Sequence, residues 1–270
     1  MLKYLIPEGK TEVNIIKLLN KKKFINFILE EDCNYPKESE PGGKSRINSY
    51  INSFGTRLGI DPLRYLILRD LDEHDNETFN TIKQSIENAV KKLFEVRGFS
   101  ASHIKFKKSK NYANIYTFSC KNPDFKLSLH IADFPKIDDN MPKFIKSTTD
   151  DYILRLIIKK KTMQNLYNDL YKNKSIKPES PDIIRQKVIK EVRELLENNK
   201  IILEEAKDFI RIYSTITRTG LSPAAIVNKI INHSSDEDIK EVFISFIWAV
   251  NYLSEEDYSV FHNLLEFKSS

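Results

Sequence analysis

The sequence predicts an α/β fold: a mainly parallel sheet flanked by helices, followed by an all-α C-terminal domain. Two short apolar runs, at residues 2–7 and 64–68, have the length and composition of buried strands. Each run is followed by a segment in which apolar residues recur at helical spacing, and this alternation is typical of a parallel sheet with helices on both faces. From about residue 148 onward only the helical spacing remains.

The elements of the first half are predicted from periodicity and from structure-breaking residues. After the first strand we expect a helix at 11–23, a short strand at 24–30, a Pro- and Gly-rich loop at 34–43, helices at 45–55 and 76–96, and the second run, 64–68, between those helices. Two β-rich segments, 115–120 and 125–134, are separated by Lys121-Asn122-Pro123-Asp124. This turn chemistry suits a hairpin or a strand added at the sheet edge.

The second half is predicted to be helical throughout. The expected helical segments are 149–172, 181–199, 201–218, 222–232, 235–252 and 254–266, separated by prolines and a glycine. We place the boundary between residues 138 and 148, which predicts two domains, 1–145 and 146–270. The apolar run 242–250, with Trp248, fits a core or an oligomer interface equally well.

Composition narrows the functional class. The 270 residues are 40% apolar, enough for a core, and no stretch has the roughly 18 uncharged apolar residues of a membrane span. The N-terminal run contains Glu8 and lacks the pattern of a signal peptide, so we expect a cytoplasmic protein without a membrane partner. Cys33 and Cys120 have no metal-site spacing and are read as ordinary thiols. The net charge of +5 arises entirely in residues 1–150; it suits a polyanionic partner or reflects a lysine-rich proteome.

Four carboxylates follow the two predicted strands. Glu8 and Glu12 come after the first strand, and Asp70 and Asp72 come at the end of the second. Because the carboxyl ends of parallel strands meet at one edge of a sheet, these side chains are expected to meet. Like charges at such distances repel unless a cation neutralises them, and carboxylates are ligands that Mg²⁺ accepts. Asp70 and Asp72 alternate with Leu71, so in an extended strand end both point to the same side.

The turn after the first strand also suits an anion. Gly9 lets the backbone or a phosphate approach closely, and Lys10 with the helix N-terminus adds positive potential. Lys44 follows a Pro41-Gly42-Gly43 break. From their positions, Lys10 and Lys44 are our candidates for a cation that offsets the charge of a reacting phosphate.

These motifs resemble the Toprim family, the metal-binding fold of topoisomerases, primases, recombination proteins and nucleases of the overcoming-lysogenization-defect (OLD) type. In that family a Glu-Gly turn follows the first strand and an Asp-x-Asp follows a later one, matching Glu8-Gly9 and Asp70-Leu71-Asp72. The form Glu-Gly-x-Thr-Glu looks most like the OLD-type nucleases and small stand-alone Toprim proteins, and Gly42-Gly43-Lys44 is similar to an element of some of them. The resemblance covers roughly residues 1–135. Pro7, where the family usually has a β-branched or apolar residue, departs from the pattern.

The resemblance implies metal-assisted phosphodiester hydrolysis of DNA or RNA, with Mg²⁺, or Mn²⁺ in its place, held by Glu8, Asp70 and Asp72. Glu12 would complete a second metal site. No G-x-x-x-x-G-K-[ST] signature occurs, so an ATPase of the larger nucleases would be a separate chain, as would a regulatory protein. By analogy with the family alone, the nuclease would serve as an antiviral defence effector.

Several further residues allow both a functional and a structural interpretation. Asp133, at the end of the 125–134 segment, is either another metal ligand or a helix cap or turn residue. The run Lys105, Lys107, Lys108 and Lys110 either contacts substrate backbone or is a solvated face. Glu73 and Asp75 suit outer-shell ligands or a solvated loop, and His74 and His130 are given no role. Tyr152, Tyr167 and Tyr171 fit a core stripe better than a nucleic-acid surface.

Two other functions compete with the nuclease. One is a non-catalytic Toprim module that binds a protein or nucleic-acid partner; retention of all four carboxylates argues against it, since a scaffold has no need of them. The other, primase-like nucleotidyl transfer, is weakened by the absence of a zinc-binding segment. A topoisomerase would need a nucleophilic tyrosine in a further large domain. The sequence does not separate DNA from RNA or endonuclease from exonuclease.

Overall fold

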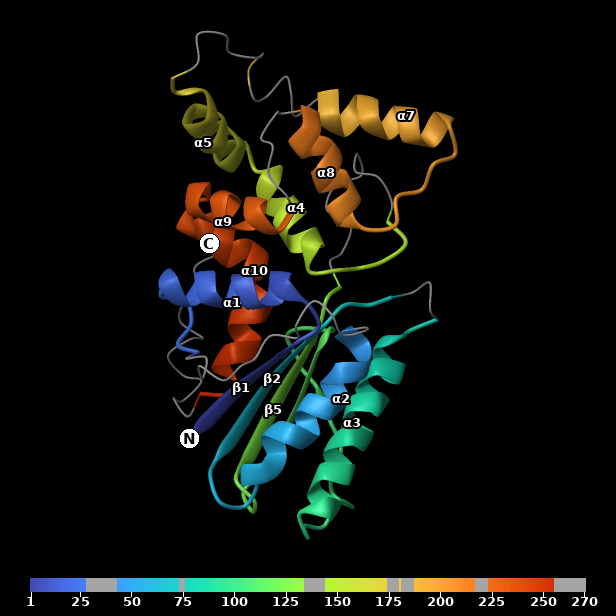
Figure 1. The fold of residues 1–270 in the computed structure, drawn as a ribbon, viewed down its shortest axis with the longest axis vertical. Helices are drawn as coiled ribbons and strands as arrows, with labels where there is room; N and C mark the ends of the chain where they lie inside the picture. The colour runs from blue at the N-terminus through green and yellow to red at the C-terminus, as the bar shows by residue number, and fades with distance from the viewer. Residues whose placement is uncertain are drawn as a thin grey trace.

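The computed structural model describes residues 1–27, 43–72, 76–133, 144–173, 180, 187–216 and 223–254. In these ranges the protein is an α/β fold built on a mixed, mostly parallel sheet (Figure 1). The strand order is β1-β2-β5-β4-β3. Their bounds are β1 (Leu2–Pro7), β2 (Leu63–Arg69), β3 (Lys107–Lys108), β4 (Ile115–Cys120) and β5 (Phe125–Ile131).

Strands β1, β2 and β5 are parallel, whereas β4 is antiparallel to β5 and β3 is antiparallel to β4. The predicted hairpin between residues 115–120 and 125–134 is therefore confirmed. Its second strand, β5, lies inside the sheet between β2 and β4 and not at an edge. This position is explained by burial, because nearly every residue of β5 is buried and an edge strand would leave one side exposed.

Helices α2 (Gly43–Phe54) and α3 (Phe79–Val96) cover one face of the sheet. Alternate residues of β2 point to this face, and Tyr65 and Ile67 pack there with Ile86, Val90 and Phe94 of α3. Thr78 caps α3 by accepting a hydrogen bond from the backbone N–H of Thr81, and this fixes where the helix begins. The short helix η1 (Gly55–Arg57) connects α2 to the loop before β2.

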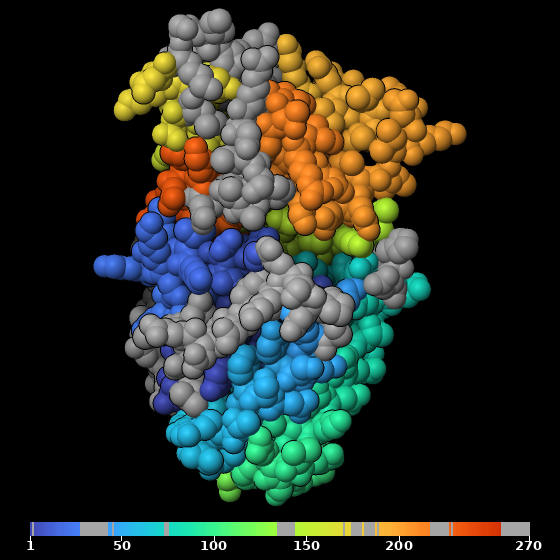
Figure 2. Space-filling view, in the orientation of Figure 1, coloured from blue at the N-terminus to red at the C-terminus, as the bar shows by residue number. Residues whose placement is uncertain are grey.

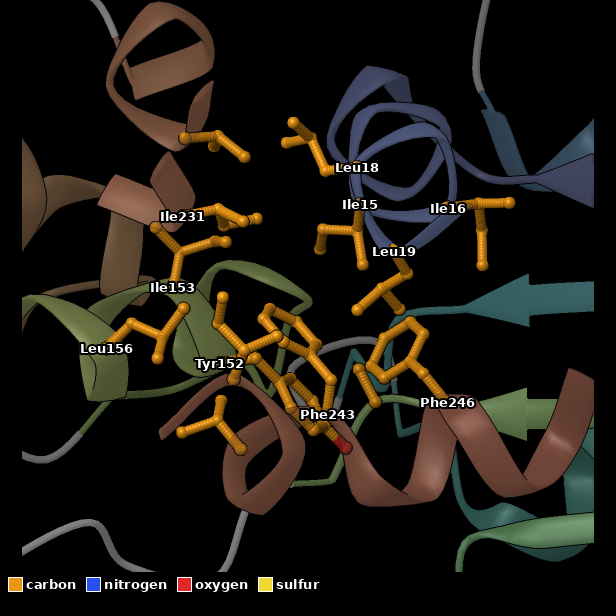
Figure 3. Close-up of a cluster of buried hydrophobic side chains, with 14 of the residues drawn as sticks. Ile15, Ile16, Leu18, Leu19, Tyr152, Ile153, Leu156, Ile231, Phe243 and Phe246 are labelled. Atoms are coloured by element: carbon orange, nitrogen blue, oxygen red, sulfur yellow. The ribbon is translucent and has the colours of Figure 1, made fainter. Parts of the chain in front are cut away.

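The other face is covered by α1 (Lys10–Lys21) together with helices from the second half of the chain. Leu66 and Leu68 of β2 belong to the same core cluster as Ile15 and Leu19 of α1. Figure 3 shows these α1 side chains pointing toward Tyr152, Phe243 and Phe246, which come from two C-terminal helices. Residues more than 200 positions apart thus share one core.

The C-terminal helices are α4 (Asp150–Ile157), α5 (Lys160–Tyr171), η3 (Lys187–Glu191), α7 (Val192–Asn198), α8 (Ala206–Ile216), α9 (Pro223–His233) and α10 (Asp236–Asn251). The single helix expected at 149–172 is two helices, because Lys159 adopts an extended conformation. In Figure 2, α7 and α8 lie at the upper right of the visible face and α2 and α3 form its lower part. The segment 254–266 lies outside the described residues apart from Ser254. The division into two domains stays a prediction.

The short strand expected at 24–30 is wrong in its described part, residues 24–27. Asn20 of α1 explains the difference: its Oδ1 accepts a hydrogen bond of 2.8 Å from the backbone N–H of Phe27. The segment is thus held by a helix side chain and not by a neighbouring strand. Within the described residues, α1 is therefore followed by α2 before β2, with no strand assigned between the two helices. None of the helices in the described ranges has the length and apolarity that a membrane crossing requires.

A buried polar network joins β5 to α10 and α4. His130 Nε2 lies 3.0 Å from Ser245 Oγ and 3.5 Å from the hydroxyl of Tyr152. Asn114 completes the network by donating from Nδ2 to the carbonyl of Ile131 at 2.9 Å. Burial lowers the pKa of His130 to about 3, so the imidazole is neutral in the folded protein.

This network predicts a pH dependence of stability that a His130→Gln variant should lack. The folded-state pKa of His130 lies below the unfolded value of about 6.5, so its contribution is complete above pH 6.5 and is lost as pH falls toward 3. Between pH 7 and pH 5 the wild type should lose about 2 kcal/mol relative to the variant. The measurement is chemical denaturation of both proteins at each pH.

The difference between the two proteins, and not the wild type alone, must be followed. Burial raises the pKa values of Asp150 and Asp151 to about 7, and these groups destabilise the fold as pH rises, in the opposite sense to His130. A difference between wild type and variant that stays constant from pH 7 to pH 5 would show that His130 does not carry this effect.

Candidate metal centre

The candidate centre forms where β1 and β2 end. The strands are parallel, and Pro7 pairs with Leu68, so Glu8 and Asp70 leave the sheet at the same edge. The backbone N–H of Glu8 donates to the carbonyl of Leu68 at 3.1 Å, and the carboxylate of Glu8 accepts from the N–H of Asp70 at 3.0 Å. The structure thus brings Glu8 and Asp70 together as the sequence predicts.

Glu12 reaches the same place from the first turn of α1. Gly9 is the N-cap of this helix, and its N–H donates to Glu12 Oε2 at 2.9 Å, so the Glu12 side chain folds back over the turn. Only 2% of Glu12 is exposed. A Cβ atom on Gly9 would lie 3.1 Å from that carboxylate, a tight contact, so a larger residue here would require the Glu12 side chain to shift slightly.

Thr149, just before α4, connects two of these carboxylates. Its hydroxyl oxygen lies 2.7 Å from Glu12 Oε1 and 3.0 Å from Asp70 Oδ1, and its backbone N–H donates to Asp70 Oδ1 at 2.8 Å. One hydroxyl proton can be donated to only one carboxylate at a time. Without a cation, the second short contact therefore favours a protonated carboxyl group.

The charge on these groups is consistent with this geometry. Burial raises the pKa of Asp70 well above its usual value, and the neighbouring Glu12 and Glu8 raise it further. The pKa of Glu12 is also raised, mainly by burial. The hydrogen bond from Thr149 lowers this pKa, and the charge of Glu8 raises it again. Glu12 is buried and Asp70 is half-buried beside it, so ionisation of both carboxyl groups at once is costly.

Asp72 lies among cations. Lys44 Nζ is 3.1 Å and Lys146 Nζ 3.6 Å from Asp72 Oδ2. Burial opposes ionisation of Asp72, but these lysines hold its pKa below the usual value. The other carboxylate oxygen, Oδ1, is buried and has no hydrogen-bond partner among the residues that the structure describes. The four carboxylates therefore divide into a group of three and Asp72, which is paired with lysines.

Arg69 and Glu77 connect the two groups. Arg69 forms ion pairs with Glu8 and, at 2.7 Å, with Glu77. Glu77 in turn accepts from the N–H of Asp72 at 3.2 Å and pairs with Lys44 at 3.2 Å. The site is thus a continuous network of alternating charges, and the acidic turn is rigidly connected to the Asp-x-Asp segment.

Gly43 accounts for the position of Lys44. A side chain on Gly43 would lie 2.4 Å from the carbonyl oxygen of Glu8, a distance that real contacts do not show. Glycine therefore allows the N-terminus of α2 to approach the Glu8 turn, and the next residue, Lys44, then reaches Asp72.

The remaining candidates have different positions. Lys10 is exposed on the first turn of α1, and its role stays a prediction. Asp133 follows β5, and its backbone carbonyl lies 3.5 Å from the hydroxyl of Tyr152, near Asp151. Tyr152 and Tyr171 are buried, in agreement with the prediction that these tyrosines face the core. Glu73, His74 and Asp75 lie outside the described residues.

Among the residues that the structure describes, no three His, Cys, Asp or Glu side chains are arranged as a formed metal-binding group. The donor chemistry nevertheless fits a hard divalent cation: three adjacent carboxylates with excess negative charge, and a buried oxygen of Asp72 that no described residue contacts by a hydrogen bond. Glu8, Glu12 and Asp70 are the residues that could hold such an ion, with Asp72 beside them.

Sequence reasoning missed the four residues that organise these acids: Arg69, Glu77, Lys146 and Thr149. Arg69 directly precedes Asp70, and a charged residue at the end of an apolar strand is a signal that could have been used. Thr149 stands in the polar run Ser147-Thr148-Thr149, a pattern typical of a helix start, but nothing local indicates its partners. Comparison of the chain with protein families, with curated proteins and with solved structures finds no match.

The contacts of Thr149 predict that it positions the carboxylates. Thr149→Val keeps the shape of the side chain and removes the hydroxyl, so Mg²⁺ affinity, measured by calorimetry, should fall by about tenfold to a hundredfold. Thr149→Ser keeps the hydroxyl and should bind Mg²⁺ nearly as the wild type does. Equal Mg²⁺ affinity of the Val and Ser variants would contradict this role.

Proposed function

We propose that this protein is a Mg²⁺-dependent nuclease that hydrolyses phosphodiester bonds of DNA or RNA, with a Toprim-like site. The observation that carries the proposal is the convergence of Glu8, Glu12 and Asp70 at the ends of two parallel strands, where Thr149 contacts two of them. Placing three carboxylates together, one of them buried and two half-buried, is costly without a counter-charge. A bound divalent cation supplies the missing charge.

Mg²⁺ at this site would offer charge stabilisation at a phosphodiester and activation of water. The chain's own residues provide the rest. Thr149 and the N–H of Gly9 orient Asp70 and Glu12, and Arg69 fixes Glu8. Lys44 and Lys146 both lie close to Oδ2 of Asp72, where they can also bind a phosphate oxygen.

One observation favours the alternative, a non-catalytic module that binds a partner. Glu8 is paired with Arg69, and Asp72 with Lys44 and Lys146, so part of the acidic charge is already neutralised within the chain. A module of this kind would use the network as a rigid scaffold. The two proposals differ in what they expect of Glu12 and Asp70, which have no such cationic partner in the contacts described above.

The nuclease proposal predicts loss of cleavage when the acidic group is changed. Purified protein should cleave at least one of plasmid DNA, single-stranded DNA and RNA with Mg²⁺ or Mn²⁺, and EDTA should abolish the cleavage. Glu8→Gln and Asp70→Asn keep the side-chain shapes and should lower the rate by about a hundredfold or more, because each removes charge at the reacting centre.

Glu95→Gln, at an exposed position of α3, removes the same charge elsewhere and should leave the rate unchanged. Cleavage that persists in both site variants would show that the acidic group is not the catalytic centre. A wild type that cleaves none of the substrates with either metal would favour the binding module. A defence role and a separate ATPase partner stay predictions from the family resemblance.

A further inference from the structure

Three partly exposed aromatic side chains lie together on the side of the sheet that α10 covers. Tyr112, in the turn between β3 and β4, has its ring centroid 5.9 Å from that of Trp248 on α10. Trp248 in turn stacks on Tyr252, with centroids 5.9 Å apart and ring planes at 19°. Each is half-buried and packs against the core beneath α10, so part of each ring reaches the surface.

Lysines border this aromatic edge. Lys107 is paired with Thr117 of β4, and Thr117 faces the same way as Ile115, which belongs to the core beneath α10. Directly paired residues of antiparallel strands have side chains on one face, so Lys107 projects on the side of α10. Lys110 lies in the same turn as Tyr112. Both lysines are exposed, and neither forms an ion pair with another described residue.

These side chains begin at the same end of the sheet as the candidate metal centre, the end where the parallel strands finish. β3 is antiparallel to β4, and β4 is antiparallel to β5, so β3 runs in the same direction as β5. The turn that follows β3 therefore lies at the carboxyl ends of the parallel strands. Asn114 fixes it there, because its side chain donates to the carbonyl of Ile131 at the end of β5.

We infer that this aromatic–lysine strip, made of Lys107, Lys110, Tyr112, Trp248 and Tyr252, binds single-stranded nucleic acid. The surface-facing parts of these half-buried rings offer stacking surfaces to bases, and the two exposed lysines beside them neutralise phosphates. In a duplex the faces of the bases are covered by neighbouring base pairs. A duplex would therefore interact only through the attraction between its phosphates and the lysines. A role of the strip in guiding substrate to the candidate metal centre rests on the proposed nuclease function. Binding of the single strand itself does not require hydrolysis.

Trp248 is the only tryptophan in the chain, so the protein carries its own probe. The experiment titrates wild type with a single-stranded oligonucleotide in EDTA, which prevents hydrolysis, and follows both tryptophan fluorescence and the anisotropy of a labelled strand. Binding should quench Trp248, and a duplex of the same sequence should bind at least tenfold more weakly at equal salt.

Variants separate the charge contribution from the stacking contribution. Lys107→Gln with Lys110→Gln should reduce the salt dependence of binding, lowering the slope of log K against log salt by about 1.4 for two phosphate contacts. The matched control, Lys92→Gln with Lys161→Gln, changes two exposed lysines on α3 and α5 and should keep the wild-type slope. Trp248→Leu should weaken binding by about tenfold. The lysine variants alter only surface groups, so the test does not depend on whether Trp248→Leu folds.

The inference is overturned if wild type does not bind the single strand, if Trp248 fluorescence is unchanged on binding, if duplex binds equally well, or if both lysine pairs have the same salt slope. These outcomes are separable from failure of the nuclease. Glu8→Gln should bind the oligonucleotide like wild type, so binding without cleavage would refute only the nuclease, and cleavage without strip-dependent binding would refute only the strip.

Discussion

The structure depends on one electrostatic constraint: three carboxylates, the buried Glu12 and the half-buried Glu8 and Asp70, lie together at the ends of β1 and β2. Each carboxylate accepts a hydrogen bond from a backbone N–H: Glu12 from Gly9, Glu8 from Asp70, and Asp70 from Thr149. Burial and mutual repulsion raise the pKa values of Glu12 and Asp70, so this arrangement costs free energy in the absence of a cation. The rest of the fold supplies the rigidity that keeps these groups in place.

That rigidity comes from both halves of the chain. Thr149 belongs to the C-terminal half, yet it contacts Glu12 from the first helix across 137 positions of sequence. The segment before it pairs with the exit of β2 through Leu71 and Ser147, and the next residues enter the core that α1 shares with α10. The helical half therefore completes the acidic site, and disruption of its packing on α1 would also displace Thr149.

Local patterns were sufficient for part of this structure. The positions of Glu8 and Asp70 follow from two parallel strands that end side by side. Lys44 was selected from its position as a cation, whereas its contact with Asp72, made possible by Gly43 beside Glu8, is seen only in the structure. Thr149 and Lys146 could not be found in this way, because their partners are distant in sequence. The prediction of a strand at 24–30 was wrong in its described part, 24–27, for a similar reason. There the hydrogen bond between Asn20 and Phe27 takes the place of the strand–strand pairing that the apolar pattern suggested.

The central claim is that the acidic group binds a divalent cation, and thermal unfolding with and without Mg²⁺ tests it most directly. Wild type should gain stability with the logarithm of Mg²⁺ concentration, about 2.7 kcal/mol at a hundredfold excess over the dissociation constant. Asp70→Asn keeps the acceptor for Thr149 and relieves repulsion, so it should be more stable than wild type without metal and insensitive to Mg²⁺. A wild type that does not respond to Mg²⁺, or a variant that responds equally, would contradict the account.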